Sequence, residues 1–269
     1  MAIKMIVSDL DGTLLDGAYR LSAENRAALQ KAAARGVLVT LATGRMSRSA
    51  VRYAGELGLD SPVISYNGAL VQKMDGAVLE SSFLPPEVVT KTLHYIFSRG
   101  WYVQLYTAEG LFYAAETEAA RVYRSASGVA GAAVGEGGLL ARTEGVPKLL
   151  VVAENPAQTA LVIGELTRAL SGEVDVMASN PTYIEIVRPG VSKAAAMLAI
   201  AENRGIKAAE IMAMGDSGND VAMLRAAGLG VAMGNASPAV REVADAVTAR
   251  VEENGAALAV RRYVLGEKG

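Results

Sequence analysis

The chain has 269 residues, of which 51% are hydrophobic and 20% charged, and its formal net charge at pH 7 is −2. A chain of this length buries roughly three quarters of its extended surface, so we expect a folded protein with a sizeable core. The balanced charge, without a basic block, argues against a nucleic-acid partner. There is no cysteine, which excludes disulfides, thiolate nucleophiles and cysteine-bound zinc, so any chemistry must rely mainly on oxygen groups.

The apolar stretches are short. The longest, GVLVTLATG and PKLLVVA, fall well below the ~18 residues that a membrane-spanning helix needs. An acidic residue, Asp9, comes too early for a signal peptide. We therefore expect a cytoplasmic protein without a membrane partner. The sequence gives no indication of its oligomeric state.

The first eighty residues alternate between strand and helix patterns. Alternation of this kind predicts a parallel sheet covered by helices, with ligands at the carboxyl ends of the strands. A hairpin follows at residues 69–80, where Asp75 and Gly76 supply the turn. The expected elements are a strand at 3–8, a helix at 22–35 closed by Gly36, a strand at 37–42, a helix ending near Gly58 and a strand at 62–65.

Pro85 and Pro86 begin a segment in which helix patterns occur with paired strands, and the strand–helix alternation returns after residues 189–190. We expect a doubly wound, Rossmann-like parallel sheet formed by residues 1–83 and 188–269, with an α+β domain inserted at 84–187. Within the insertion we expect a helix to residue 100, strands at 101–106 and 111–115, a helix, a glycine-rich loop at 135–138, a strand at 148–152, a helix, and strands at 173–178 and 182–187. In the final segment we expect a helix from 192, a strand at 210–215, a helix, a strand at 229–233, a helix, a short strand at 246–248 and a closing helix.

Few aromatic or imidazole side chains stand out as candidates for chemistry. The single histidine, His94, falls beside the apolar stripe of its predicted helix, which favours a structural or surface role over a catalytic one. Trp101, Tyr102 and Tyr106 lie in a predicted strand of the insertion. They fit the core of that domain and also a sugar-binding face.

Asp9 and Asp11 follow an apolar run that reads as a buried strand. Side chains two residues apart in extended chain point the same way, so the two carboxylates would converge. Two desolvated anions repel each other unless a positive charge lies between them. The stretch therefore predicts a bound cation.

Polar residues follow other predicted core strands or begin a core helix. Each has an ordinary interpretation alone, as a turn, a helix cap or a solvated side chain, but a doubly wound sheet brings several strand ends to one crevice. Lys193 at a helix start, with a Thr-Gly turn at Thr43 and Gly44, suits a phosphate group. Carboxylates suit Mg²⁺, which also binds phosphate oxygens. These residues are Thr43, Gly44, Arg45, Lys193 and the run Asp216 to Asp220.

Four short motifs occur in series: DLDGT at 9–13, TG at 43–44, SK at 192–193 and GDSGND at 215–220. They resemble the motifs of the haloacid dehalogenase superfamily, in its phosphohydrolase branch. With the insertion between the second and third motifs, and SYNGAL at 65–70, the chain is most similar to the Cof-type phosphatases, which have a C2-type cap. The resemblance covers the whole chain, although the insertion matches only in position, size and coarse pattern.

The resemblance implies a role for each matching residue. Asp9 would be the nucleophile that forms an aspartyl phosphate, and Asp11 would protonate the leaving group and then activate water. The phosphoryl group would be bound by Thr43, Gly44, Lys193 and Asn219.

The resemblance also implies a magnesium site. Mg²⁺ would be bound by the carboxylates of Asp9 and Asp216 and the backbone carbonyl of Asp11, with Asp220 supporting these ligands. Arg45 and Asn67 are further candidates to face the substrate, and Thr13 is either an orienting hydroxyl or a plain turn residue.

The expected substrate is a small phosphorylated metabolite such as a sugar phosphate, contacted by the insertion as a closing lid. A phosphomutase of the same superfamily is the main alternative. A phospho-accepting receiver module is a weaker one, since receivers are about half this length and lack an insertion. A dehalogenase is disfavoured, because displacement of a halide from carbon needs no Mg²⁺ site.

Overall fold

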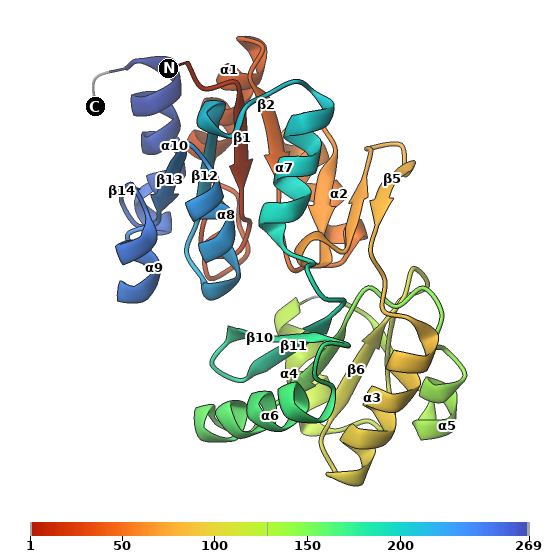
Figure 1. The fold of residues 1–269 in the computed structure, drawn as a ribbon. Coiled ribbons are helices and arrows are strands. Elements are labelled where there is room, and N and C mark those ends of the chain that lie inside the picture. The colour runs from red at the N-terminus through yellow and green to blue at the C-terminus, as the bar shows by residue number, and fades with distance from the viewer. Residues whose placement is uncertain (1, 128, 268–269) are drawn as a thin grey trace. The chain divides into compact units, whose positions relative to one another are not determined.

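The structure is a computed structural model that describes residues 2–127 and 129–267 (Figure 1). The contacts divide the chain into two compact units, Met1–Glu80 with Ser192–Gly269, and Ser81–Val191. The boundaries expected from the sequence lie at 83/84 and 187/188. Each unit has its own sheet and its own hydrophobic core.

The first unit, called the core unit below, contains a five-stranded parallel sheet in the order β14-β13-β12-β1-β2. A three-stranded sheet, β3-β4-β5, continues it, because a parallel bridge joins Ala42 to Ile64 next to the end of β2. The strands are β1 (Met5–Ser8), β2 (Leu38–Leu41), β3 (Val63–Ser65), β4 (Leu70–Gln72), β5 (Val78–Ser81), β12 (Ile211–Gly215), β13 (Leu229–Ala232) and β14 (Ala246–Val247). The longer helices are α1 (Ala23–Ala34), α2 (Ser47–Glu56) and α7 (Lys193–Asn203). The shorter helices are α8 (Val221–Ala226), α9 (Pro238–Val243) and α10 (Gly255–Val260).

Both faces of the parallel sheet are covered by helices, as in a doubly wound fold. Ile6 in the central strand packs into a cluster with α1, α2 and α10, whereas its neighbours Met5 and Val7 pack into a second cluster with α7, α8 and α9. This alternation is the period of two expected of a strand. The predicted α/β fold with a parallel sheet is confirmed.

The strand order places a reversal at β1. The chain passes from β1 to β2 on one side and later returns to β12 on the other side. The register pairs Ser8 with Met214, so the residues that follow these two strands emerge next to each other. A reversal of this kind is the place where open α/β sheets bind ligands.

The second unit has a six-stranded sheet in the order β10-β11-β9-β6-β7-β8. One face is apolar: Leu105, Leu149 and Ile184 pack in a cluster with buried residues of α3 and α6. Its elements are α3 (Pro86–Ser98), β6 (Val103–Tyr106), β7 (Leu111–Tyr113), α4 (Glu118–Ser127), β8 (Gly131–Ala133), α5 (Gly135–Leu140), β9 (Leu149–Val152), α6 (Pro156–Ala169), β10 (Asp175–Asn180) and β11 (Tyr183–Val187).

The glycine-rich segment at 135–138 is not the loop that the sequence predicts. It begins helix α5, where Gly135 has a φ of +73° and Leu139 is fully buried in the cluster. Burial of one large side chain here outweighs the poor helix propensity of three glycines. The strand β8 was not expected either, and it pairs in parallel with β7.

The aromatic residues and His94 occupy different environments. His94 is exposed on α3, in agreement with a surface role. Trp101 packs against the apolar cluster of the second unit. Tyr106 is buried, and its hydroxyl hydrogen-bonds with Gln104 and with Tyr123.

The opposite face of this sheet contains a buried ion pair. Lys148 Nζ lies 3.0 Å from Glu185 Oε2, both side chains are at most 5% exposed, and the ammonium also lies over the ring of Tyr106 at 4.9 Å. Burying two charges costs desolvation that their attraction only roughly offsets. Removing one charge of the pair therefore lowers the stability of the folded unit, because the other charge stays buried after losing the opposite charge beside it.

We expect Lys148→Met to destabilise the second unit by about 3 kcal/mol, because the buried carboxylate of Glu185 would lose the positive charge that faces it. Trp101 is the single tryptophan of the chain and belongs to this unit, so its fluorescence during urea unfolding reports the change. The matched control is Lys148→Met with Glu185→Leu, which should recover most of the loss. Wild-type stability in Lys148→Met alone would contradict this assignment.

Candidate active site

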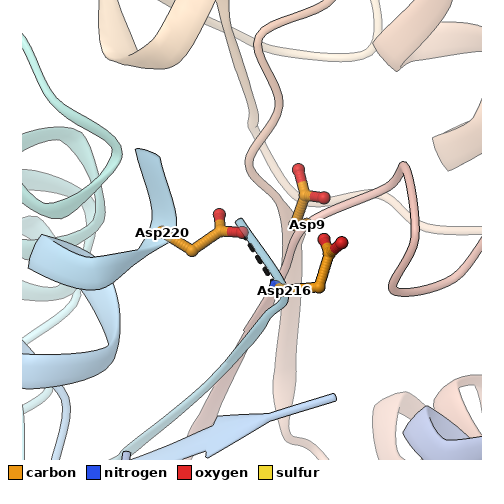
Figure 2. Close-up of side chains that lie close together, drawn as sticks. All are labelled: Asp9, Asp216 and Asp220. Atoms are coloured by element: carbon orange, nitrogen blue, oxygen red, sulfur yellow. Dashed lines mark hydrogen bonds between the residues drawn. The ribbon is translucent and has the colours of Figure 1, made fainter. Parts of the chain in front are cut away.

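Three aspartates meet at the reversal of the parallel sheet. Asp9 follows β1, and Asp216 and Asp220 follow β12, and each offers an oxygen within 4.8 Å of the others. Figure 2 shows the three carboxylates gathered at the ends of these segments. Residues about two hundred positions apart in the chain are thus brought together, as the sequence predicts for Asp9 and Asp216.

Lys193 supplies the positive charge of this cluster. It begins α7, where Ser192 Oγ accepts a hydrogen bond from the backbone of Ala195, and its side chain is fully buried. Its Nζ lies 2.6 Å from Asp9 Oδ1 and 2.7 Å from Asp220 Oδ1. Burial disfavours the ammonium form, but the carboxylates of Asp220 and Asp9 outweigh it, so the pKa of Lys193 lies above its ordinary value.

One ammonium does not balance three carboxylates. Burial raises the pKa of Asp9 well above its ordinary value, and the negative charges around it act in the same direction against Lys193. Burial, followed by the charge of Asp220, raises the pKa of Asp216 to about 7. The cluster has too much negative charge for its surroundings, which is the condition that favours a bound cation.

Asp220 is committed to hydrogen bonds within the protein. Its Oδ1 accepts from Lys193, and its Oδ2 accepts from the backbone N–H groups of Asp216 and Ser217, both at 3.0 Å. The dashed line in Figure 2 marks the bond to Asp216. Gly215 permits this approach, because a Cβ there would lie 2.5 Å from Asp220. Asp9 and Asp216 are therefore the carboxylates better placed to hold an ion.

The loop after β1 packs directly against Asp216. Gly12 has a φ of +76°, and a Cβ at this position would lie 2.4 Å from Asp216 Oδ2. The hydroxyl of Thr13, a fully buried residue, donates to Asp216 Oδ1 at 3.3 Å. Of the two interpretations left open for Thr13, the structure favours the orienting hydroxyl.

The side chain of Asp11 is 44% exposed and is held by Arg45. The guanidinium donates from Nε to Asp11 Oδ2 at 2.7 Å and from Nη2 to Asp11 Oδ1 at 2.6 Å. It also lies over the rings of Tyr19 and Tyr53, at 4.8 and 5.4 Å from their centroids. A bidentate pair fixes both position and orientation of the carboxylate. From the sequence, Arg45 was expected only as a candidate to face the substrate, although its position directly after a Thr-Gly at a strand end was the available signal.

Thr43, Asn67 and Asn219 connect the end of β2 with the loop after β12. The carbonyl of Thr43 accepts from the N–H of Asn67 at 3.0 Å, and Asn219 Nδ2 donates to Asn67 Oδ1 at 2.9 Å. Asn67 has a φ of +57° and precedes Gly68, where a Cβ would lie 2.3 Å from the carbonyl of Ser192, next to Lys193. Gly44 follows Thr43 directly. The sequence-predicted phosphate-binding residues are thus linked with the aspartate cluster.

Among the described residues, no helix has the length and hydropathy needed to cross a membrane.

Residues 6–260 match the family model of haloacid dehalogenase-like hydrolases. The chain is 34% identical to the 5-amino-6-(5-phospho-D-ribitylamino)uracil phosphatase YcsE of Bacillus subtilis, over 98% of this chain and 96% of that protein. It is 31% identical to a putative phosphatase, YxeH, of the same organism, over 98% of this chain and 99% of that one.

Solved structures show the same similarity. The crystal structure of a haloacid dehalogenase-like hydrolase from Bacteroides thetaiotaomicron superimposes with a TM-score of 0.86 at 30% identity, over 97% of this chain and 99% of that one. The protein TM0651 from Thermotoga maritima gives a TM-score of 0.84 at 31% identity, over 97% of both chains.

The raised pKa of Asp216 predicts a pH-dependent cost in the metal-free protein. Its folded-state pKa of about 7 exceeds the ordinary 3.8, so the folded state binds this proton more tightly than the unfolded chain between these values. The cost is absent at low pH and complete above about pH 7. With a chelator present, Asp216→Asn should raise Tm at pH 8, and the gain should shrink as the pH falls to 5. The control is Asp60→Asn at an exposed site; an equal gain at both pH values would contradict the prediction.

Proposed function

Because the chain belongs to the haloacid dehalogenase-like hydrolases and its relatives are phosphatases, we propose that it is a Mg²⁺-dependent phosphatase of small metabolites that forms a covalent intermediate on Asp9. The observation that supports this best is the environment of Asp9. Its carboxylate lies at the sheet reversal, 2.6 Å from Lys193 Nζ and within reach of Asp216. The Asp9 carboxylate is thus held in position, with one of its oxygens hydrogen-bonded to the Lys193 ammonium.

The donor set fits Mg²⁺. The cluster contains only carboxylate oxygens, is short of positive charge, and includes no nitrogen or sulfur ligand. Asp9 and Asp216 would hold the ion, with the backbone carbonyl of Asp11, while Asp220 orients Lys193 and the loop that begins at Asp216. When bound, Mg²⁺ would neutralise charge that develops on the phosphoryl oxygens.

The covalent step is assigned to Asp9. A carboxylate oxygen of Asp9 would form a bond to phosphorus while the bond from phosphorus to the alcohol oxygen breaks. Lys193 would stabilise negative charge on both the nucleophile and the phosphoryl group. Thr43, Gly44 and Asn219 would bind the remaining phosphoryl oxygens through hydroxyl, backbone and amide groups.

Asp11 would act as the general acid and then as the general base. In the first step it would give a proton to the departing alcohol oxygen, and in the second it would take one from the water that attacks the aspartyl phosphate. In the structure Arg45 donates a hydrogen bond to each oxygen of this carboxylate, so at least one of these bonds would open when Asp11 takes up the proton. Water attack returns Asp9 as a carboxylate and releases inorganic phosphate.

We propose a sugar or sugar-alcohol phosphate as the substrate class. The Bacillus subtilis relative is named for a phosphorylated ribitylamino compound, whose phosphate is carried on a sugar-alcohol chain. The active-site machinery makes no demand on the alcohol beyond a leaving oxygen. Release of phosphate from such compounds, without isomerisation of glucose or mannose phosphates, would separate this activity from that of a phosphomutase.

Activity on a generic aryl phosphate should require Mg²⁺ and Asp9. We expect a chelator to abolish turnover, and Asp9→Asn to lower kcat by about 10⁴-fold or more, because the amide is a poor nucleophile. Steady-state release of the phenol measures both effects, with Asp60→Asn as the matched control. Undiminished turnover in Asp9→Asn would reject the covalent route.

Asp11→Asn should separate proton transfer from metal binding. The variant should lose about 10²- to 10⁴-fold in kcat, because an amide cannot exchange the proton. It should still bind Mg²⁺, since the backbone carbonyl of residue 11 is unchanged. Titration calorimetry of Mg²⁺ on the variant tests this; loss of binding would show that the Asp11 carboxylate itself is a ligand.

A further inference from the structure

Asn235 joins three parts of the core unit that meet at the aspartate cluster. It follows β13, and its Nδ2 donates to the carbonyl of Gly12 at 2.8 Å and lies 3.5 Å from Asp216 Oδ2. Its Oδ1 accepts the backbone N–H of Val251 at 3.0 Å. Asn235 lies outside the four motifs of the sequence.

The amide group has one orientation that satisfies its surroundings. Val251 N–H is a donor and must face the amide oxygen, whereas the Gly12 carbonyl and the Asp216 carboxylate are acceptors and must face the amide nitrogen. A rotated amide would oppose like groups on both sides. The side chain is therefore locked by the end that faces away from the aspartates.

The backbone around Asn235 is also fixed. The N–H of Gly234 donates to the carbonyl of Ala249 at 3.0 Å, and a Cβ at Gly234 would lie 2.9 Å from the backbone of Ala249. This close crossing leaves little freedom to the residue that follows. Asn235 therefore projects from a rigid segment onto the loop after β1.

We infer that Asn235 is a positioning residue for the metal site, which orients the Gly12 peptide and the Asp216 carboxylate so that the site favours a small, strictly octahedral ion. The inference rests on the proposed function in that it takes Asp9 and Asp216 as the metal carboxylates. A Cβ at Gly12 would lie only 2.4 Å from Asp216 Oδ2, so the Gly12 backbone passes close to this carboxylate, and a shift of its peptide would change the space that the carboxylate has. Thr13 donates to Oδ1 of Asp216 at 3.3 Å, and Asn235 Nδ2 lies 3.5 Å from Oδ2 of the same carboxylate.

A positioning role differs measurably from a merely structural one. Mg²⁺ demands a near-ideal octahedron, whereas Ca²⁺ accepts six to eight ligands in flexible geometry. Loosening the orientation of one carboxylate should therefore weaken Mg²⁺ binding more than Ca²⁺ binding. Loss of fold stability alone would weaken both ions equally or neither.

The experiment measures the dissociation constants of Mg²⁺ and Ca²⁺ by titration calorimetry on the full chain, without substrate. We expect Asn235→Ala to weaken Mg²⁺ binding by about tenfold or more, and Ca²⁺ binding by less than about threefold. The matched control is Asn25→Ala. Asn25 is a buried amide that joins the same loop to α10, through the carbonyl of Leu14 and the N–H of Ala257, without touching an aspartate.

The control should unfold at a lower temperature yet bind Mg²⁺ within about twofold of wild type. If Asn235→Ala does not fold, Asn235→Ser takes its place, because its hydroxyl is too short to span Gly12 and Val251 together. Mg²⁺ affinity within about twofold of wild type in the Asn235 variant overturns the inference, as does an equal loss for the two ions or an equal loss in Asn25→Ala. Failure of the wild-type protein to bind Mg²⁺ would instead overturn the proposed function.

Discussion

The repulsion among three carboxylates, two buried and one half-buried, set against a single buried ammonium, governs the architecture of the candidate site. Lys193 is bonded to Asp9 and Asp220 at the same time, so it holds together residues from β1 and from the segment after β12. An uncompensated buried ammonium would cost several kcal/mol, and so would an uncompensated buried carboxylate. Each charge would destabilise the fold if it were buried without the other. The pairing therefore holds the start of α7 at the sheet reversal.

The sheet makes this arrangement possible through its register. Parallel pairing of Ser8 with Met214 delivers Asp9 and Asp216 side by side, and the β1–β2 pairing of Ser8 with Leu41 brings Thr43 to the same edge. The five strands of the parallel sheet contain no charged residue, because helices cover both faces of the sheet. The charged side chains of the site follow the strand ends or begin a helix, which concentrates the chemistry there.

The sequence was sufficient for the parts of the structure that depend on short-range patterns. The core strands, the helix that begins near Ser22 and the gathering of strand-end aspartates follow from periodicity and from the geometry of parallel sheets. Helix α5 was missed because its formation depends on burial of Leu139 against distant residues, which local composition does not reveal. Asn235 was missed for the same reason, since its partners, Gly12 and Val251, are separated from it along the chain. The bond between Arg45 and Asp11 likewise depends on the pairing of β1 with β2, and a sequence shows only the adjacency of Arg45 to Gly44.

The charge of the site also bears on the binding of an anionic substrate. Asp11 is balanced by Arg45, so the imbalance is that of Asp9, Asp216 and Asp220 against Lys193. A phosphate monoester is itself an anion and would be repelled by a cluster in this state. Burial and the charge of Asp220 raise the pKa of Asp216 to about 7, so a cation that binds this carboxylate near neutral pH would compete with a proton. A cation held by Asp9 and Asp216 would lower the repulsion between this cluster and the phosphate group of a substrate, and so would favour substrate binding through its charge.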